Sequence, residues 1–232
     1  MISSDKSLGE ITASLVRTVS PKVLPRRMAA IAVQIMRLLA NGRPVSPEQL
    51  GEVCSLQQED TVEIVRQFQT MGLAELDEKG KIVGMVLSLR PTAHRFHING
   101  RELFTWCAVD TLFLPALLQQ EADVESNCPT TGKQIHLRVN SNELAEIEPV
   151  GAVLSLLAPG CTVGISANCG PELVGSQGSF CKNVLFFSSE KASSLWLAEH
   201  PGAVILPVKE AFDLARNVWA LPFLSSLQEL SP

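Results

Sequence analysis

The chain has 232 residues, of which 46% are hydrophobic and 19% are charged, and its net charge is −5. This composition is typical of a folded soluble protein and excludes disorder for most of the chain, while the length allows one large domain or two small ones. The negative charge argues against a dedicated binder of polyanions. Residues 1–10 lack the basic start and apolar run of a secretory signal, so we expect a cytoplasmic protein with reduced thiols.

Residues 23–89 carry the pattern of three helices followed by a β-hairpin. Apolar residues recur at helical spacing from Met28 to Ala40, and Asn41-Gly42 predicts the end of this helix. A capping box with proline at the first helical position, Ser46-Pro47-Glu48-Gln49, opens a second helix. Ser55 and Gln58 predict a similar start for the third. Two apolar runs around a polar turn complete a winged-helix-like pattern.

The charges of this unit bear on whether it binds DNA. A winged helix reads DNA by placing its third helix in the major groove. Residues 23–85 hold seven Lys and Arg against eight Asp and Glu, and the third helix begins with Glu59, Asp60 and Glu63. Phosphate contacts need clustered basic side chains. We therefore expect a structural or covering role for this unit.

From residue 90 the pattern alternates strands with short helices. Asn99-Gly100 is a favoured two-residue turn between predicted strands at 93–98 and 101–105. The uncharged stretch from Pro149 to Pro171 is interrupted by Pro159 and by glycines, so it predicts a strand and a loop and not a membrane span. The remaining predicted elements are helices at 106–118, 192–199 and 209–219 and strands at 135–139, 152–157, 183–187 and 203–208.

These elements predict an α+β fold, with a winged-helix-like three-helix domain followed by a domain of mixed or antiparallel sheets and short helices. The expected organisation has four parts: a loosely attached leader at 1–22, the winged-helix-like domain at 23–89, a second domain at 90–220 and a C-terminal tail at 221–232.

Histidines and common catalytic motifs indicate no site. His94 and His97 are three residues apart on a predicted strand and should point to opposite faces, and His136 and His200 have no partner nearby in the sequence. The motifs GxSxG, HExxH, GxGxxG and the P-loop are absent. No CxxC pair occurs, which argues against a zinc ribbon or a thioredoxin-like motif. The six cysteines therefore need to be considered one by one.

Cys107 stands at the start of a predicted helix, where the helix dipole and free N–H groups lower a thiol pKa. Asp110 follows at helical spacing, so the two side chains should share a face about 5–6 Å apart, close enough to exchange a proton or to share an ion. Cys181 begins a predicted strand after the glycine-rich loop 175–178 and is able to approach Cys107. The alternatives are that each cysteine is a small buried hydrophobe and that Asp110 only favours the helix dipole.

The segment 101–118, RELFTWCAVDTLFLPALL, resembles the signature of the organomercurial lyases, also called alkylmercury lyases. The likeness extends from about residue 25 to residue 218. Other segments are similar to the same family in the same order: LANGRPVS at 39–46, TGKQIHLRV at 131–139, EPVG at 148–151 and GSFCKNVLFF at 178–187.

This resemblance implies an enzyme that cleaves the carbon–mercury bond of alkyl- and arylmercury compounds by protonolysis, giving a hydrocarbon and mercuric ion without an organic cofactor. It implies that Cys107 and Cys181 bind mercury as thiolates, which suit this soft cation, and that Asp110 contacts the metal and shuttles the proton. The N-terminal domain would cover the catalytic domain at 90–220. Trp106 and Phe180 would line an apolar pocket or belong to the ordinary core.

Partners follow from the same resemblance: a small organomercurial as substrate, low-molecular-weight thiols or a mercuric reductase as acceptor of the ion, and neither nucleic acid nor membrane. Cys161 and Cys169 lie in a predicted long loop that the family motifs do not account for. Three roles are open for these cysteines: a mercury relay, spare thiols or packed residues. Cys54 and Cys128 are expected to be structural. Two other functions stay open: a thiol-based metal-sensing winged-helix DNA-binding regulator, and an inactive protein that sequesters mercury.

Overall fold

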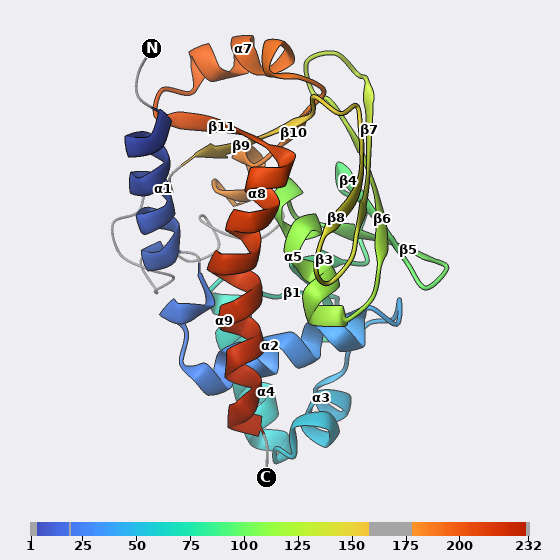
Figure 1. Cartoon of the computed structure of the whole chain (residues 1–232). Coiled ribbons are helices and arrows are strands. Elements are labelled where there is room, and N and C mark those ends of the chain that lie inside the picture. Colours follow the sequence, from blue (N-terminus) through green and yellow to red (C-terminus); the bar gives the residue numbers. More distant parts are fainter. Residues whose placement is uncertain (1–3, 19, 158–177, 231–232) are drawn as a thin grey trace.

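The computed structural model describes residues 4–18, 20–157 and 178–230, and it combines helices with antiparallel sheets (Figure 1). This architecture confirms the predicted α+β class. The α-helices are α1 Ser4–Thr18, α2 Arg26–Leu39, α3 Pro47–Cys54, α4 Gln58–Thr70, α5 Ala108–Leu118, α7 Glu190–Glu199, α8 Val208–Ala215 and α9 Leu221–Ser226. Short helical turns are η1 Pro21–Val23, η2 Cys181–Asn183, the π-helical η3 Arg216–Ala220 and η4 Leu227–Leu230.

The strands form one sheet of eight, in the order β1-β2-β3-β5-β4-β6-β7-β8, and one of three, in the order β10-β9-β11. All neighbouring strands are antiparallel. Asn99 and Gly100 join β4 to β5 with φ of 49° and 70°, which confirms the predicted tight turn. The strands are β1 Glu75–Leu76, β2 Ile82–Met85, β3 Leu87–Ser88, β4 His94–Ile98, β5 Arg101–Thr105, β6 Ala122–Asn127, β7 Gln134–Val139, β8 Leu144–Glu148, β9 Val153–Leu157, β10 Phe186–Phe187 and β11 Ala203–Pro207.

The first half of the chain contains α2, α3 and α4, followed by the antiparallel pair of β1 and β2. Ser46 and Gln49 form the predicted capping box at the start of α3, with each side chain accepting a hydrogen bond from the backbone N–H of the other residue. The predicted cap at Ser55 is wrong. Ser55 is the C-cap of α3, in the left-handed conformation with φ of 52° and its N–H donating to the Gly51 carbonyl. The residue that precedes α4 is Gln57.

Both ends of the described chain are packed. Ile11 and Leu15 of α1 are buried, and α1 contacts β11 and η3, so this segment is not loosely attached. At the other end α8, η3 and α9 run on from one another along the molecule (Figure 1), and α9 packs against α2. Pro222 lies in the first turn of α9, where a missing N–H is tolerated. The division into four parts stays a prediction, and β1 to β3 belong to the same sheet as the later strands.

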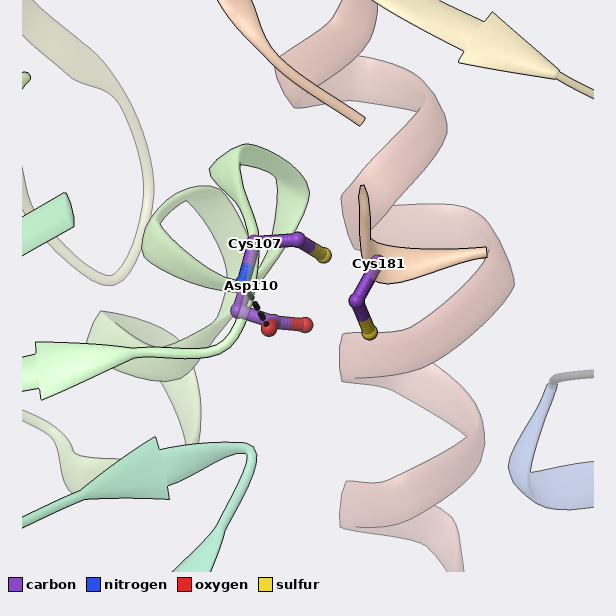
Figure 2. A group of neighbouring side chains, drawn as sticks. All are labelled: Cys107, Asp110 and Cys181. Carbon is purple, nitrogen blue, oxygen red and sulfur yellow. Dashed lines mark hydrogen bonds between the residues drawn. The ribbon is translucent and has the colours of Figure 1, made fainter. Parts of the chain in front are cut away.

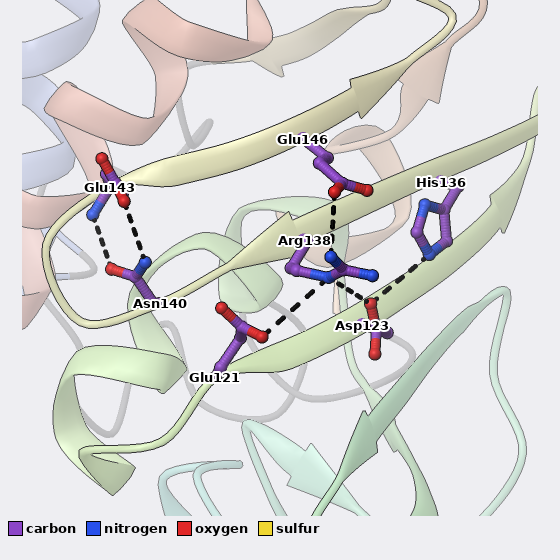
Figure 3. A network of polar contacts seen from close by, with 7 residues as sticks. All are labelled: Glu121, Asp123, His136, Arg138, Asn140, Glu143 and Glu146. Carbon is purple, nitrogen blue, oxygen red and sulfur yellow. Dashed lines mark hydrogen bonds and ion pairs between the residues drawn. The ribbon is translucent and has the colours of Figure 1, made fainter.

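The eight-stranded sheet has one wet and one buried face at β6 and β7. On the wet face Arg138 forms ion pairs with Asp123 at 3.2 Å and Glu146 at 2.8 Å (Figure 3). The alternate side chains of β7, Ile135 and Leu137 among them, are buried, as the alternating sequence predicted. Helix α5 contacts β4, β5 and β7, and nearly all its side chains are buried. Among the described helices, none combines the length and the apolar character needed to cross a membrane.

Candidate active site

Cys107 occupies the junction between β5 and α5. Three hydrogen bonds fix this junction: the Trp106 N–H donates to the Val86 carbonyl at 2.9 Å, the Ala108 N–H donates to the Val184 carbonyl at 3.1 Å, and the Thr105 hydroxyl donates to the Cys107 carbonyl at 3.0 Å. The Cys107 side chain is completely buried. The strand, the helix and two more distant segments therefore hold this thiol in one place.

Asp110 is the third residue of α5, as the sequence predicted. Its Oδ2 accepts a hydrogen bond from the Cys107 N–H at 2.9 Å (Figure 2), and the residue is only 6% exposed. Asp110 thus stabilises the helix start and at the same time lies against the thiol of Cys107. The sequence left open whether Asp110 belongs to a site with Cys107 or only favours the helix start. Its position in the structure is compatible with both.

Cys181 lies in the short helical turn η2, so the prediction of a strand beginning at this residue is wrong. The turn uses backbone groups that a strand would need, because Asn183 N–H donates to the Phe180 carbonyl and Val184 N–H to the Cys181 carbonyl. The Asn183 side chain also donates to the Ser179 carbonyl at 2.7 Å. Strand pairing starts only at Phe186. Cys181 is buried, with 6% exposure.

The fold brings the three predicted site residues together. The sulfurs of Cys107 and Cys181 and a carboxylate oxygen of Asp110 all lie within 4.8 Å of one another. Figure 2 shows these side chains facing a common space between the start of α5 and the η2 turn. Cys54 and Cys128 are buried outside this cluster. Cys161 and Cys169 lie outside the described residues.

The protonation of the site differs from the expectation for a helix start. Burial raises the pKa of the Cys107 thiol well above its usual value, and a hydrogen bond with Cys181 and the charge of Asp110 act in the same direction. The expected lowering of this pKa is wrong, because these effects outweigh the helix dipole. Burial also raises the pKa of Asp110 to about 7, against hydrogen bonds from Cys107 that lower it. A protonated thiol thus contacts a carboxyl group that titrates near neutrality.

An apolar cavity of about 60 Å³ adjoins Asp110 and Cys181. Trp106 and Phe180, each beside a cysteine, line it and are also buried, so both interpretations of these residues hold. Three other aromatic side chains of this cavity were not predicted from the sequence; they come from α5, η3 and α9 and are Phe113, Trp219 and Phe223. The rings of Phe113 and Trp219 stack at 5.9 Å. Their helical spacing is that of ordinary core residues, so no local signal could have found them.

A second and more polar pocket, of about 590 Å³, is also lined by Cys181. We call it the polar pocket, and its lining includes Glu75, Arg90, His94, Trp106, Cys181 and Lys182. Trp106 and Cys181 line the apolar cavity as well. Nothing in the sequence pattern indicated this pocket, because its residues come from four separate segments.

Together, the fold and the site define a thiol enzyme with a paired carboxyl group beside an apolar cavity. The family model of the alkylmercury lyases, MerB, matches residues 87–220. Alkylmercury lyase of Staphylococcus epidermidis is 37% identical over 186 residues, 80% of each chain, and that of Pseudomonas putida is 37% identical over 194 residues, 84% of this chain and 85% of the relative. The chain belongs to the alkylmercury lyase family and is an enzyme that cleaves the carbon–mercury bond of organomercurials.

A solved structure supports the fold. The mercury-bound form of MerB2 superposes with a TM-score of 0.71 at 24% identity, covering 97% of this chain and 100% of that one. At this level of identity the likeness concerns the fold, and the roles of individual residues rest on the geometry of the site itself.

Proposed function

We propose that Cys107 and Cys181 bind the mercury atom of an organomercurial and that Asp110 carries the proton to carbon. The observation that carries this proposal is the approach of two sulfurs and a carboxylate oxygen to within 4.8 Å beside an apolar cavity. Mercury is a soft cation and thiolates are soft ligands, so two thiolates bind it strongly and weaken its bond to carbon.

The proton balance starts from a protonated Cys107 thiol and an ionised Asp110. Mercury binds Cys181 first, and the thiol proton of this residue leaves with the ligand that the substrate loses. Asp110 then takes the proton of Cys107 as the second sulfur binds mercury, and it donates this proton to carbon. The electron pair of the carbon–mercury bond forms the new carbon–hydrogen bond. Mercuric ion remains between two thiolates, and the steps involve no redox change and no organic cofactor.

The apolar cavity is the place for the organic group of the substrate. Its volume of about 60 Å³ accepts a methyl or ethyl group. A cavity that holds benzene measures about 150 Å³, so a phenyl group must displace side chains of the wall. We infer that small alkylmercury compounds fit this protein without rearrangement.

The proposal extends to the surroundings of the site. Residues 23–89 serve as a winged-helix-like cover, supported by Leu24 and Leu73, which line the apolar cavity. Acidic residues in the first turn of α4, Glu59 and Asp60, oppose binding to nucleic acid.

The enzyme works in the cytoplasm, where thiols stay reduced, and it passes mercuric ion to low-molecular-weight thiols or to a mercuric reductase.

Hydrocarbon release from methylmercury or phenylmercury tests this function. With excess thiol we expect repeated turnover. Without thiol we expect about one hydrocarbon per protein molecule, because the two thiolates that hold the substrate also hold the product. Retention of intact organomercurial with no hydrocarbon would indicate a protein that only sequesters mercury and would refute the proposal.

A further inference from the structure

Cys181 and Trp106 line two cavities of different chemistry. One is the apolar cavity of about 60 Å³, with its aromatic wall, and the other is the polar pocket of about 590 Å³. Cys107 lines neither cavity, and its side chain is completely buried. A molecule in the polar pocket therefore contacts Cys181 and not Cys107.

The polar pocket offers cations on its open side. Lys182 is exposed, and the Arg90 side chain is 58% exposed, with its guanidinium 4.0 Å from the Glu75 carboxylate. Two cationic side chains thus face one carboxylate in the lining. Such an excess of positive charge beside a site attracts anions and raises their local concentration.

His94 adds no charge to this pocket. Its Nδ1 lies 2.7 Å from the Ser126 hydroxyl, and burial lowers the pKa of its imidazole to about 4, so the ring is neutral at physiological pH. The attraction for anions therefore rests on Lys182 and Arg90.

We propose that the polar pocket binds a small thiol that carries a carboxylate, and that this thiol takes mercuric ion from Cys181 first and from Cys107 second. Lys182 and Arg90 attract the carboxylate, while the thiol sulfur reaches mercury beside Cys181. This inference rests on the proposed function, because it concerns the release of the product that this function forms.

The exchange balances without an oxidant. The sulfur of the first acceptor thiol binds mercury, the bond from mercury to Cys181 breaks, and the proton of the acceptor goes to the Cys181 sulfur. A second thiol repeats the step at Cys107, where Asp110 lies close enough to relay the proton. The products are the free dithiol protein and a mercuric dithiolate.

The test loads the full-length protein directly with mercuric chloride and measures the rate of mercury loss to two thiols of similar size. One is 3-mercaptopropionate, which is anionic, and the other is 2-mercaptoethanol, which is neutral. At equal thiolate concentration we expect the anionic thiol to act about fivefold faster on the wild type, with an advantage that salt reduces. Lys182→Gln and Arg90→Gln should each reduce this advantage, and Lys182→Arg should retain it.

Lys79→Gln is the matched control, because Lys79 lies on the turn between β1 and β2 and lines a different pocket. Equal rates for the two thiols on the wild type would overturn the inference, and so would an undiminished advantage in both Lys182→Gln and Arg90→Gln. Loading with mercuric chloride makes the test independent of carbon–mercury cleavage. Failure of the wild type to release hydrocarbon would therefore refute the proposed function, whereas failure of the thiol preference would refute only this inference.

Discussion

Two buried cysteines of this protein, Cys107 and Cys128, have opposite surroundings. Cys107 lies beside a carboxyl group and a second thiol, and burial with these neighbours raises its pKa. Cys128 follows β6 in a tight loop and is only 1% exposed. Burial acts to raise its pKa too, but hydrogen bonds outweigh burial and lower the pKa to about 6, with three residues contributing them: Thr130, Thr131 and Ser188.

Under the proposed mechanism, protonolysis does not need an acidic thiol. A thiolate such as Cys128 is a good ligand, yet it has no proton to give to carbon. In the proposed mechanism Cys107 keeps its proton until mercury arrives, and Asp110, which lies beside it, receives that proton. Within the described part of the chain, the group around Cys107 is the one that brings three potential mercury ligands together.

Serine substitutions should have the largest effect on turnover, and they should distinguish Cys107 and Cys181 from Cys128. Cys107→Ser or Cys181→Ser replaces a soft sulfur with a hard hydroxyl, so hydrocarbon release should fall by about 10³-fold or more. Cys128→Ser is the matched control and should change turnover by less than about twofold, because this residue is outside the cluster. Steady-state hydrocarbon release by gas chromatography measures all three. Near-normal activity of Cys107→Ser or Cys181→Ser would remove that residue from the mechanism.

Substitution of Asp110 separates binding from chemistry. Asp110→Ala and Asp110→Asn keep both thiols, so an organomercurial should still bind, while turnover falls by about 10²–10⁴-fold. The asparagine retains a side-chain oxygen for the Cys107 N–H, which controls for loss of the helix cap. Mercury retained per protein after desalting measures binding. Parallel loss of binding and turnover in both variants would make Asp110 a ligand or a fold element instead of a proton carrier.

The pH dependence of kcat/KM tests whether Asp110 titrates while the thiol of Cys107 stays protonated. Asp110 must be ionised to take the proton of Cys107, and burial raises its pKa to about 7. Therefore kcat/KM should rise about tenfold per pH unit up to about pH 7 and then level off, since the thiol of Cys107 stays protonated well above that pH. Asp110→Asn should lose this acid limb. An unchanged limb in the variant would assign the titration to another group.

The smallest expected effect concerns the apolar cavity beside Asp110 and Cys181. Phe223 of α9 lines this cavity. Phe223→Leu enlarges the cavity and should lower KM for phenylmercury about threefold, with little change for methylmercury. Phe68→Leu, in the core at α4, is a control for general loosening. Equal changes in KM for both substrates would remove this wall from substrate selection.

Local patterns of the sequence predicted the parts of the fold that local interactions determine. The capping box at Ser46, the turn at Asn99-Gly100 and the placement of Cys107 and Asp110 at a helix start all depend on residues close in the chain. The strand predicted to begin at Cys181 is wrong, because backbone hydrogen bonds within a helical turn replace strand pairing at this residue.

Properties that depend on tertiary packing could not be predicted in this way. The sign of the pKa change at Cys107 was wrong because complete burial arises from segments distant in the chain, such as the one that contains Val184. The aromatic wall from η3 and α9 and the cations of the polar pocket likewise meet only in the folded protein.

The central claim is that Asp110 delivers the proton to carbon while two thiolates hold mercury. Its most direct test is a single turnover of methylmercury on the wild type and on Asp110→Asn without added thiol, with methane and protein-bound mercury species measured together. We expect about one methane per wild-type molecule with mercuric ion retained, and intact methylmercury retained on the variant. Methane release from Asp110→Asn at nearly the wild-type rate would contradict the account.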